Sequence, residues 1–228
     1  MRRIGGRPRQ IEMGDIVRVG REIGLHQLSL NAVAARLGVS STALYRHVDG
    51  RWGLESLVGE NILADLQLPD EPSQETAQHL LSLGLRLRSF ILKHPGLAAY
   101  VQTLFPRGDS GRRLLAAEVE ALGRRGYAAD AAVVLSSAVA SVAIGYAAAE
   151  DLQRQRAEGR ARQEENALAA MGDDPRLGKA YWGLPDVGAD EYVRLWLGAA
   201  VRAFVAAAPP GRSPEQIRAA LDAAGKGL

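Results

Sequence analysis

The sequence predicts an all-α protein. Apolar residues recur at helical spacing along most of the chain, and almost no segment alternates apolar and polar residues as a half-buried strand does. Glycines, prolines and capping residues separate the helical stretches. With 228 residues, of which 47% are hydrophobic, the chain is long enough for one large domain or two small ones. We therefore expect a small helical head followed by a larger helical body.

Four helices are expected in the head. Ser29 is placed to cap the second of them, and Gly38 to end it. Ser40 or Ser41 is placed to cap the third, which ends near His47. In chain order the expected helices span 11–24, 30–37, 41–47 and 51–66.

The body is expected to hold longer helices. Their expected spans are 73–93, 97–105, 109–125, 130–158 and 191–208. Ser213-Pro214-Glu215-Gln216 has the pattern of a capping box with proline at the first helical position, which predicts a short terminal helix. Residues 158–188 are charged and then rich in glycine, proline and aspartate, so we expect a long loop there.

Composition excludes several kinds of chemistry and divides the charge unevenly. The chain has no cysteine and four histidines, which leaves no thiolate chemistry and little for a histidine metal site; no metal and no cofactor are expected. Residues 1–51 hold nine arginines and four acidic residues, a charge of +5, whereas the whole chain carries +2. A basic head on a mildly acidic body predicts a head that meets a polyanion.

No segment predicts secretion or membrane insertion. The N-terminus lacks the apolar stretch of a signal peptide. The uncharged run 131–149 has the length of a membrane span, but it consists mostly of alanine, serine and glycine, which are typical of close helix packing. We expect a cytoplasmic protein.

Residues 28–48 carry the pattern that predicts function. Ala34 is small where two short helices would cross, Gly38 permits a positive φ in the turn, and Leu44 packs between the helices. The side chains left facing outward on the second helix of the pair are Ser41, Thr42, Tyr45 and Arg46. Such groups reach base edges and phosphates, so the pattern predicts a DNA-binding helix-turn-helix. The alternative is an ordinary helical hairpin within a bundle.

The segments Leu37-Gly38-Val39-Ser40 and Ala43-Leu44-Tyr45-Arg46-His47-Val48, together with Arg51, resemble the DNA-binding head of the TetR/AcrR family of transcriptional regulators. The resemblance covers roughly residues 10–60. It implies a helix-turn-helix domain at 1–50, a connecting helix at 51–67 and a helical ligand-binding and dimerisation domain at 68–228. It further implies a homodimeric repressor that leaves its double-stranded DNA operator when a small molecule binds the body.

The resemblance also assigns residues to DNA. Tyr45 and His47 match backbone-contacting positions, as does Arg51 at the start of the fourth helix. The base-facing positions hold Ser41, Thr42 and Ala43, and Asn31 occupies a contact position on the preceding helix. Arg46 faces outward beside them. Arg7 and Arg9 flank a proline, which suits either a minor-groove arm or a solvated basic tail.

Aromatic residues of the body are the candidates for a pocket that holds an apolar or aromatic ligand. They are Phe90, Tyr100, Phe105, Tyr146 and Trp182. For any single one of them an ordinary core or interface position is the favoured alternative, because aromatic residues also dominate cores. No enzyme motif is present, so we expect no catalysis. The alternative function is a ligand-independent architectural or partner-binding helix-turn-helix protein.

Overall fold

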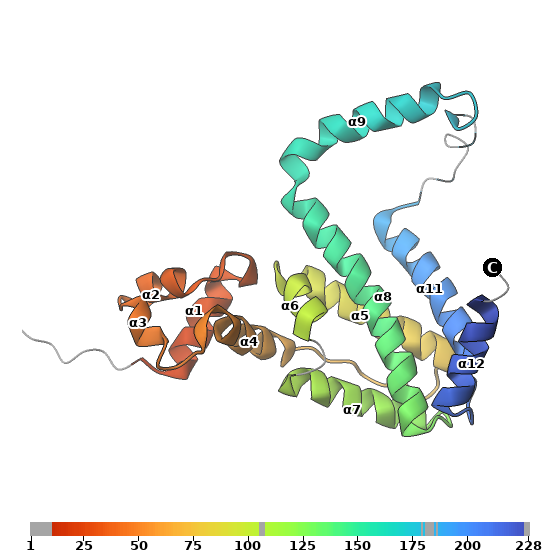
Figure 1. The fold of residues 1–228 in the computed structure, drawn as a ribbon, viewed down its shortest axis with the longest axis horizontal. Helices are drawn as coiled ribbons and strands as arrows, with labels where there is room; N and C mark the ends of the chain where they lie inside the picture. Colours follow the sequence, from red (N-terminus) through yellow and green to blue (C-terminus); the bar gives the residue numbers. More distant parts are fainter. Residues whose placement is uncertain (1–10, 105–107, 179, 181–184, 186, 226–228) are drawn as a thin grey trace, which may run out of the picture. The chain divides into compact units, whose positions relative to one another are not determined.

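The computed structural model describes residues 11–104, 108–178, 180, 185 and 187–225. Within these residues the chain forms α-helices and one 3₁₀ turn, with no strand, so the all-α prediction is confirmed (Figure 1). The chain divides into two compact units. The first comprises Met1–Gln67 and Lys93–Leu115, and the second comprises Leu68–Leu92 and Ala116–Leu228.

The first unit contains the short helices of the head. They are α1 (Met13–Ile23), the 3₁₀ turn η1 (Leu25–Gln27), α2 (Leu30–Leu37), α3 (Ser41–Leu44), α4 (Gly50–Leu63) and α6 (Leu97–Leu104). Both α3 and α4 end three residues earlier than expected. Their last turns tighten: the His47 amide donates to the Leu44 carbonyl at 2.9 Å, and the Leu66 amide to the Leu63 carbonyl at 3.1 Å.

Helix α6 joins the head through one close approach. Gly59 of α4 lies under the ring of Tyr100, where a Cβ would stand 2.7 Å from the ring atoms. The Tyr100 hydroxyl donates to Glu60 Oε1 at 2.9 Å, and the Ser110 amide donates to Glu60 Oε2 at 2.7 Å. Segment Lys93–Leu115 therefore groups with the first unit. The functional division at residues 50 and 67 stays a prediction.

The second unit is built around α5 (Thr76–Leu92), α8 (Ala129–Gln155) and α11 (Ala189–Ala207). Helix α12 (Pro214–Gly225) packs at its edge (Figure 1). Helix α7 (Asp109–Gly123) begins in the first unit and contributes its residues from 116 onward to the second. The core is made of aliphatic side chains from all five helices, including Leu80, Leu122, Leu135, Leu197 and Ile217. The predicted capping box opens α12: the Ser213 amide donates to Gln216 Oε1 at 2.9 Å, and the Gln216 amide to Ser213 Oγ at 3.4 Å.

The expected loop at 158–188 is wrong for its first half. A helix, α9 (Ala157–Asp173), occupies that stretch and leads away from the end of α8 (Figure 1). Its alanine, arginine, glutamine, glutamate and leucine residues are all strong helix formers, so a high charge content did not indicate a loop. The helix ends before Pro175, which cannot continue it.

Helix α8 is long and apolar enough to cross a membrane by length and composition. Half of its most apolar window is buried inside the structure, where α8 packs against α5 and α11. The small side chains Ala132, Val139 and Ala143 are completely buried along it. This is the pattern of the core helix of a helical bundle.

Candidate nucleic-acid interface

The helix-turn-helix of α2 and α3 is built by local signals at each end of α2. The Ser29 hydroxyl accepts a hydrogen bond from the Ala32 amide at 3.1 Å, which caps the first turn. Gly38 has φ +70° and ψ 34°, in the left-handed region, as the sequence predicts. The next amide, of Val39, donates to the Ala34 carbonyl at 3.0 Å. The turn is therefore closed by backbone hydrogen bonds as well as by packing.

Packing of α3 decides which of its faces is free. Val33 and Leu44 are completely buried, and Val48 is 7% exposed. Because these apolar side chains turn inward, the polar residues of α3 lie on the opposite face.

Arg21 of α1 donates to the Asn61 carbonyl at 3.2 Å and to Asn61 Oδ1 at 2.8 Å, which holds α1 against α4.

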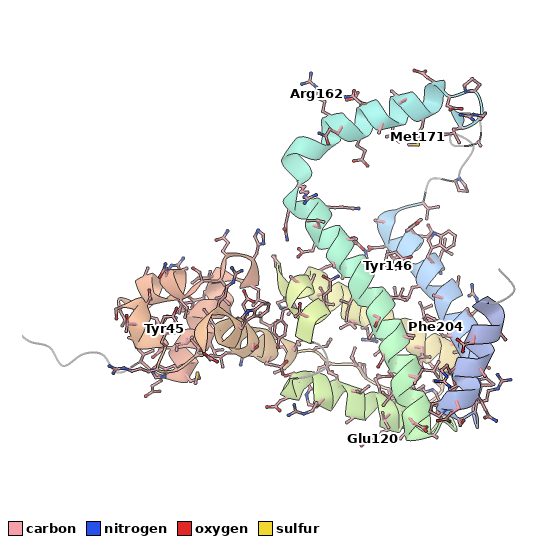
Figure 2. All side chains as sticks on the ribbon, in the orientation of Figure 1. Tyr45, Glu120, Tyr146, Arg162, Met171 and Phe204 are labelled. Carbon is pink, nitrogen blue, oxygen red and sulfur yellow. The ribbon has the colours of Figure 1, made fainter. Side chains whose placement is uncertain are left out.

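The structure brings most predicted DNA contacts together on one surface. The Ser41 hydroxyl donates to Asn31 Oδ1 at 2.6 Å, which joins the two helices through a pair of predicted contact residues. Tyr45, labelled in Figure 2, is 59% exposed. Thr42 and Arg46 are exposed, whereas Ala43 and His47 are half-buried. Arg7 and Arg9 lie outside the described residues.

Arg51 forms an ion pair within α4, and its guanidinium is accessible to solvent. Its Nε donates to Glu55 Oε1 at 2.7 Å, and the Arg51 side chain is 73% exposed. Glu55 is 20% exposed, so only the arginine end of the pair is fully solvated, and from that side a phosphate is able to approach the guanidinium. Beside it, Trp52 is 65% exposed. The sequence interpretation passed over Trp52, although its place next to Arg51 was a visible signal.

The structure does not bring the predicted ligand residues together in one unit. Tyr100 lies in the first unit, where burial and the hydrogen bond to Glu60 raise the pKa of its phenol. Phe90 and Tyr146 are half-buried in the second unit, and Tyr146 (Figure 2) packs against its core. Phe105 and Trp182 lie outside the described residues.

Two groups of charged side chains are buried in the second unit. His79, only 3% exposed, has Nε2 2.9 Å from Glu118 Oε2 and Nδ1 3.4 Å from Asp70 Oδ1. Glu118 is 39 residues from His79 in the sequence, so local spacing gives no sign of this pair. The two carboxylates lie at opposite ring nitrogens, and the described residues hold no group of three or more potential ligands that suits a metal ion.

The second buried group links three helices. Arg88 of α5 is 5% exposed and donates to Glu150 of α8 through Nε at 2.7 Å and through Nη2 at 2.6 Å. Its Nη1 lies 2.9 Å from Asp190 of α11. These hydrogen bonds, above all the pair to Glu150, raise the pKa of Arg88. The arrangement is a structural clamp whose donors all have partners.

Comparisons with known proteins point to one fold. No protein-family model matches the chain. An HTH-type transcriptional regulator of Saccharopolyspora erythraea is 27% identical over 156 residues, which is 68% of this chain and 66%, just under two thirds, of that protein.

Solved structures agree over nearly the whole length. The TetR-family protein ActR of Streptomyces coelicolor, in complex with actinorhodin, superposes with a TM-score of 0.74 at 20% identity, covering 90% of this chain and 100% of that one. A TetR variant of Acinetobacter baumannii, in complex with minocycline, gives a TM-score of 0.66 at 16% identity, covering 90% and 98%. The chain therefore has the fold of the TetR family of transcriptional regulators.

Proposed function

We propose that this protein is a DNA-binding transcriptional regulator that acts as a homodimeric repressor. The observation that carries the proposal is the α2–α3 pair, in which Gly38 turns the chain and completely buried Leu44 fixes the face of α3. That packing leaves Thr42, Tyr45 and Arg46 exposed on a basic head. A helix with this free polar face fits the major groove of duplex DNA.

The proposed DNA contacts fall into two classes. Base edges are read by Ser41, Thr42 and Ala43, with Asn31 held beside them by its hydrogen bond to Ser41. Phosphates are bound by Tyr45, Arg46, His47 and Arg51, and Arg7 and Arg9, near the N-terminus, add attraction to the DNA.

We propose that α8 and α11 form the dimer interface. Both helices expose apolar side chains although they pack against each other: Val133, Val134 and Leu152 on α8, and Tyr192, Leu195 and Trp196 on α11. The rings of Tyr192 and Trp196 have centroids 6.0 Å apart. An exposed cluster of large apolar side chains on a helical pair supports burial against a second copy. A symmetric dimer places two recognition helices about one DNA turn, ~34–36 Å, apart.

The body is proposed to bind a small apolar or aromatic molecule. The protein with this ligand bound is proposed to release DNA. The likeness to ActR with actinorhodin and to TetR with minocycline supports this assignment, as do half-buried Phe90 and Tyr146 in the second unit. A ligand releases DNA only to the extent that it prefers the body conformation with the lower DNA affinity. We place this regulator in the cytoplasm and assign it no catalytic activity.

Selection of genomic fragments on the purified full-length protein tests the proposal, followed by gel shifts with the selected fragments. We expect a discrete complex on a site with two-fold symmetry that random fragments of equal length do not compete away. Thr42→Ala should alter which fragments are selected, whereas Arg162→Ala on α9, an exposed arginine of the second unit, should not. Retardation of all fragments alike, or of none, contradicts a sequence-specific regulator.

A further inference from the structure

Trp52 is an exposed tryptophan on a face of α4 whose later positions are buried and whose nearer positions, Glu55 and Ser56, are half-buried. Gly59 and Leu63 follow it by seven and eleven residues along α4, so the three share one face, and both of those later residues are buried. Trp52 itself is 65% exposed. A single exposed tryptophan is not unusual by itself, but its large ring gains free energy when a partner covers it.

The residues that precede Trp52 in the chain indicate what kind of partner would bind there. Arg51 precedes it with a side chain 73% exposed, and Tyr45, 59% exposed, stands at the end of α3. Arg46 is exposed between them in the chain, and residues 1–51 carry a net charge of +5. A polyanion suits these two exposed arginines, and duplex DNA is the polyanion that the residues before Trp52 in the chain are proposed to bind. A purely apolar partner does not account for the arginines.

We propose that Trp52 is a further DNA contact, which packs its ring on a deoxyribose and donates its indole N–H to a phosphate outside the bases read by α3. This inference rests on the proposed function. Tryptophan is suited to such a place because one end of its side chain is apolar and the other carries a hydrogen-bond donor. A contact with sugar and phosphate positions the protein without reading sequence.

The salt dependence of binding separates Trp52 from its charged neighbour. Trp52→Ala should weaken binding to selected and random fragments by the same factor, about tenfold, because a hydrogen bond to a charged group is lost. Its salt slope should equal that of the wild type, since the indole is neutral. Arg51→Ala, the matched control, should lower the slope by about one counterion. Trp52→Phe, which keeps the ring, should fall between wild type and Trp52→Ala.

Fluorescence gives a second, independent readout. The chain has three tryptophans, so the difference in emission between wild type and Trp52→Phe, which keeps Trp182 and Trp196, reports on Trp52. DNA should reduce the quenching of Trp52 by acrylamide. If a gel shift forms while quenching and the affinity of Trp52→Ala stay unchanged, Trp52 lies outside the interface and the inference is overturned. If wild-type protein binds no selected site, the proposed function itself fails. Protection of Trp52 that rises with protein concentration without DNA assigns the surface to a second copy instead, and also overturns the inference.

Discussion

The head and the body treat ionisable side chains in opposite ways. Among the described residues of 11–66, every buried side chain is aliphatic, and the charged groups are exposed or, like Glu55 and Glu60, half-buried. The second unit instead buries His79, Arg88 and Glu118. An aliphatic interior leaves the head's polar groups free to meet a partner, while buried charges tie together helices that are far apart in sequence. The difference predicts that the two parts respond differently to substitution and to acid.

Removal of a core leucine should have the largest effect and should show whether the two units unfold together. Leu44 and Leu197 are both completely buried, one under the helix-turn-helix and one in the core of the second unit. Each change to alanine should cost ~2–5 kcal/mol of unfolding free energy. Urea unfolding combined with amide exchange will locate the loss. Leu44→Ala should abolish DNA binding with exchange accelerated in the head, whereas Leu197→Ala should accelerate exchange in the body. Equal acceleration in both units after either change contradicts separate units.

Ion pairs provide the next comparison, because each unit has an Arg–Glu pair in a different environment. Arg88→Met leaves Glu150 partly buried without its partner and should cost about 3 kcal/mol. Arg51→Met breaks a pair in which the arginine is 73% exposed and Glu55 is 20% exposed, so it should cost less, ~1 kcal/mol. Thermal unfolding of both variants measures the difference. The double variant Arg88→Met/Glu150→Gln should recover part of the loss; if it does not, packing of the arginine stem matters more than its charge.

Two glycines of α4 differ in how closely another part of the chain approaches them, and one of them, Gly59, contacts Tyr100 of α6. A Cβ at Gly59 would stand 2.7 Å from the Tyr100 ring, whereas at Gly53 the nearest atoms are 3.5 Å away. Gly59→Ala should therefore cost ~1–3 kcal/mol through overpacking. Gly53→Ala should be neutral or stabilise the helix by up to about 1 kcal/mol. Equal stabilities of the two variants, measured by urea unfolding, would mean that α6 yields without cost at Tyr100.

The same contrast explains what the sequence could predict. Ser29, Gly38 and the capping box at Ser213 act on backbone groups within a few residues, so the helix ends that depend on them were predicted. The proximity of Tyr100 to Gly59 and of Glu118 to His79 depends on which helices pack together, and helical periodicity carries no such information. Helix α9 was missed for a different reason, since charge was weighed above intrinsic helix propensity.

The residues of the candidate site likewise fall into those that a local motif predicts and those that depend on packing between helices. Its α2–α3 part was predicted because a helix-turn-helix is a local motif with a spacing that can be read from the chain. Trp52 was not predicted: Arg51 beside it was a signal, but helical periodicity does not tell that a tryptophan at the start of α4 stays exposed. The ligand residues remain predictions, because a pocket is formed by several helices whose packing the periodicity does not specify.

Acid should produce the smallest and most localised effect. Asp70 lies 2.7 Å from Arg125 and 2.6 Å from Arg124, and the hydrogen bond from Arg125 is the main reason that the pKa of Asp70 is lowered from its ordinary value of 3.8. A carboxylate with a lowered folded pKa contributes stability above its unfolded pKa, and that stability is lost as pH falls through the folded value.

Wild type should therefore lose more unfolding free energy than Asp70→Asn between ~pH 5 and ~pH 2.5. Asp174→Asn is the control: Arg176 also lowers the pKa of Asp174, but the two are two residues apart and remain neighbours in the unfolded chain, so the folded state gains little from the pair. The loss should register at Trp196 of the second unit before Trp52, because the head buries no ionisable side chain among its described residues. An acid transition that begins at Trp52 would contradict this prediction. It would mean that the head unfolds first in acid, although its interior is aliphatic, and that the buried charges of the body do not set the acid sensitivity of the protein.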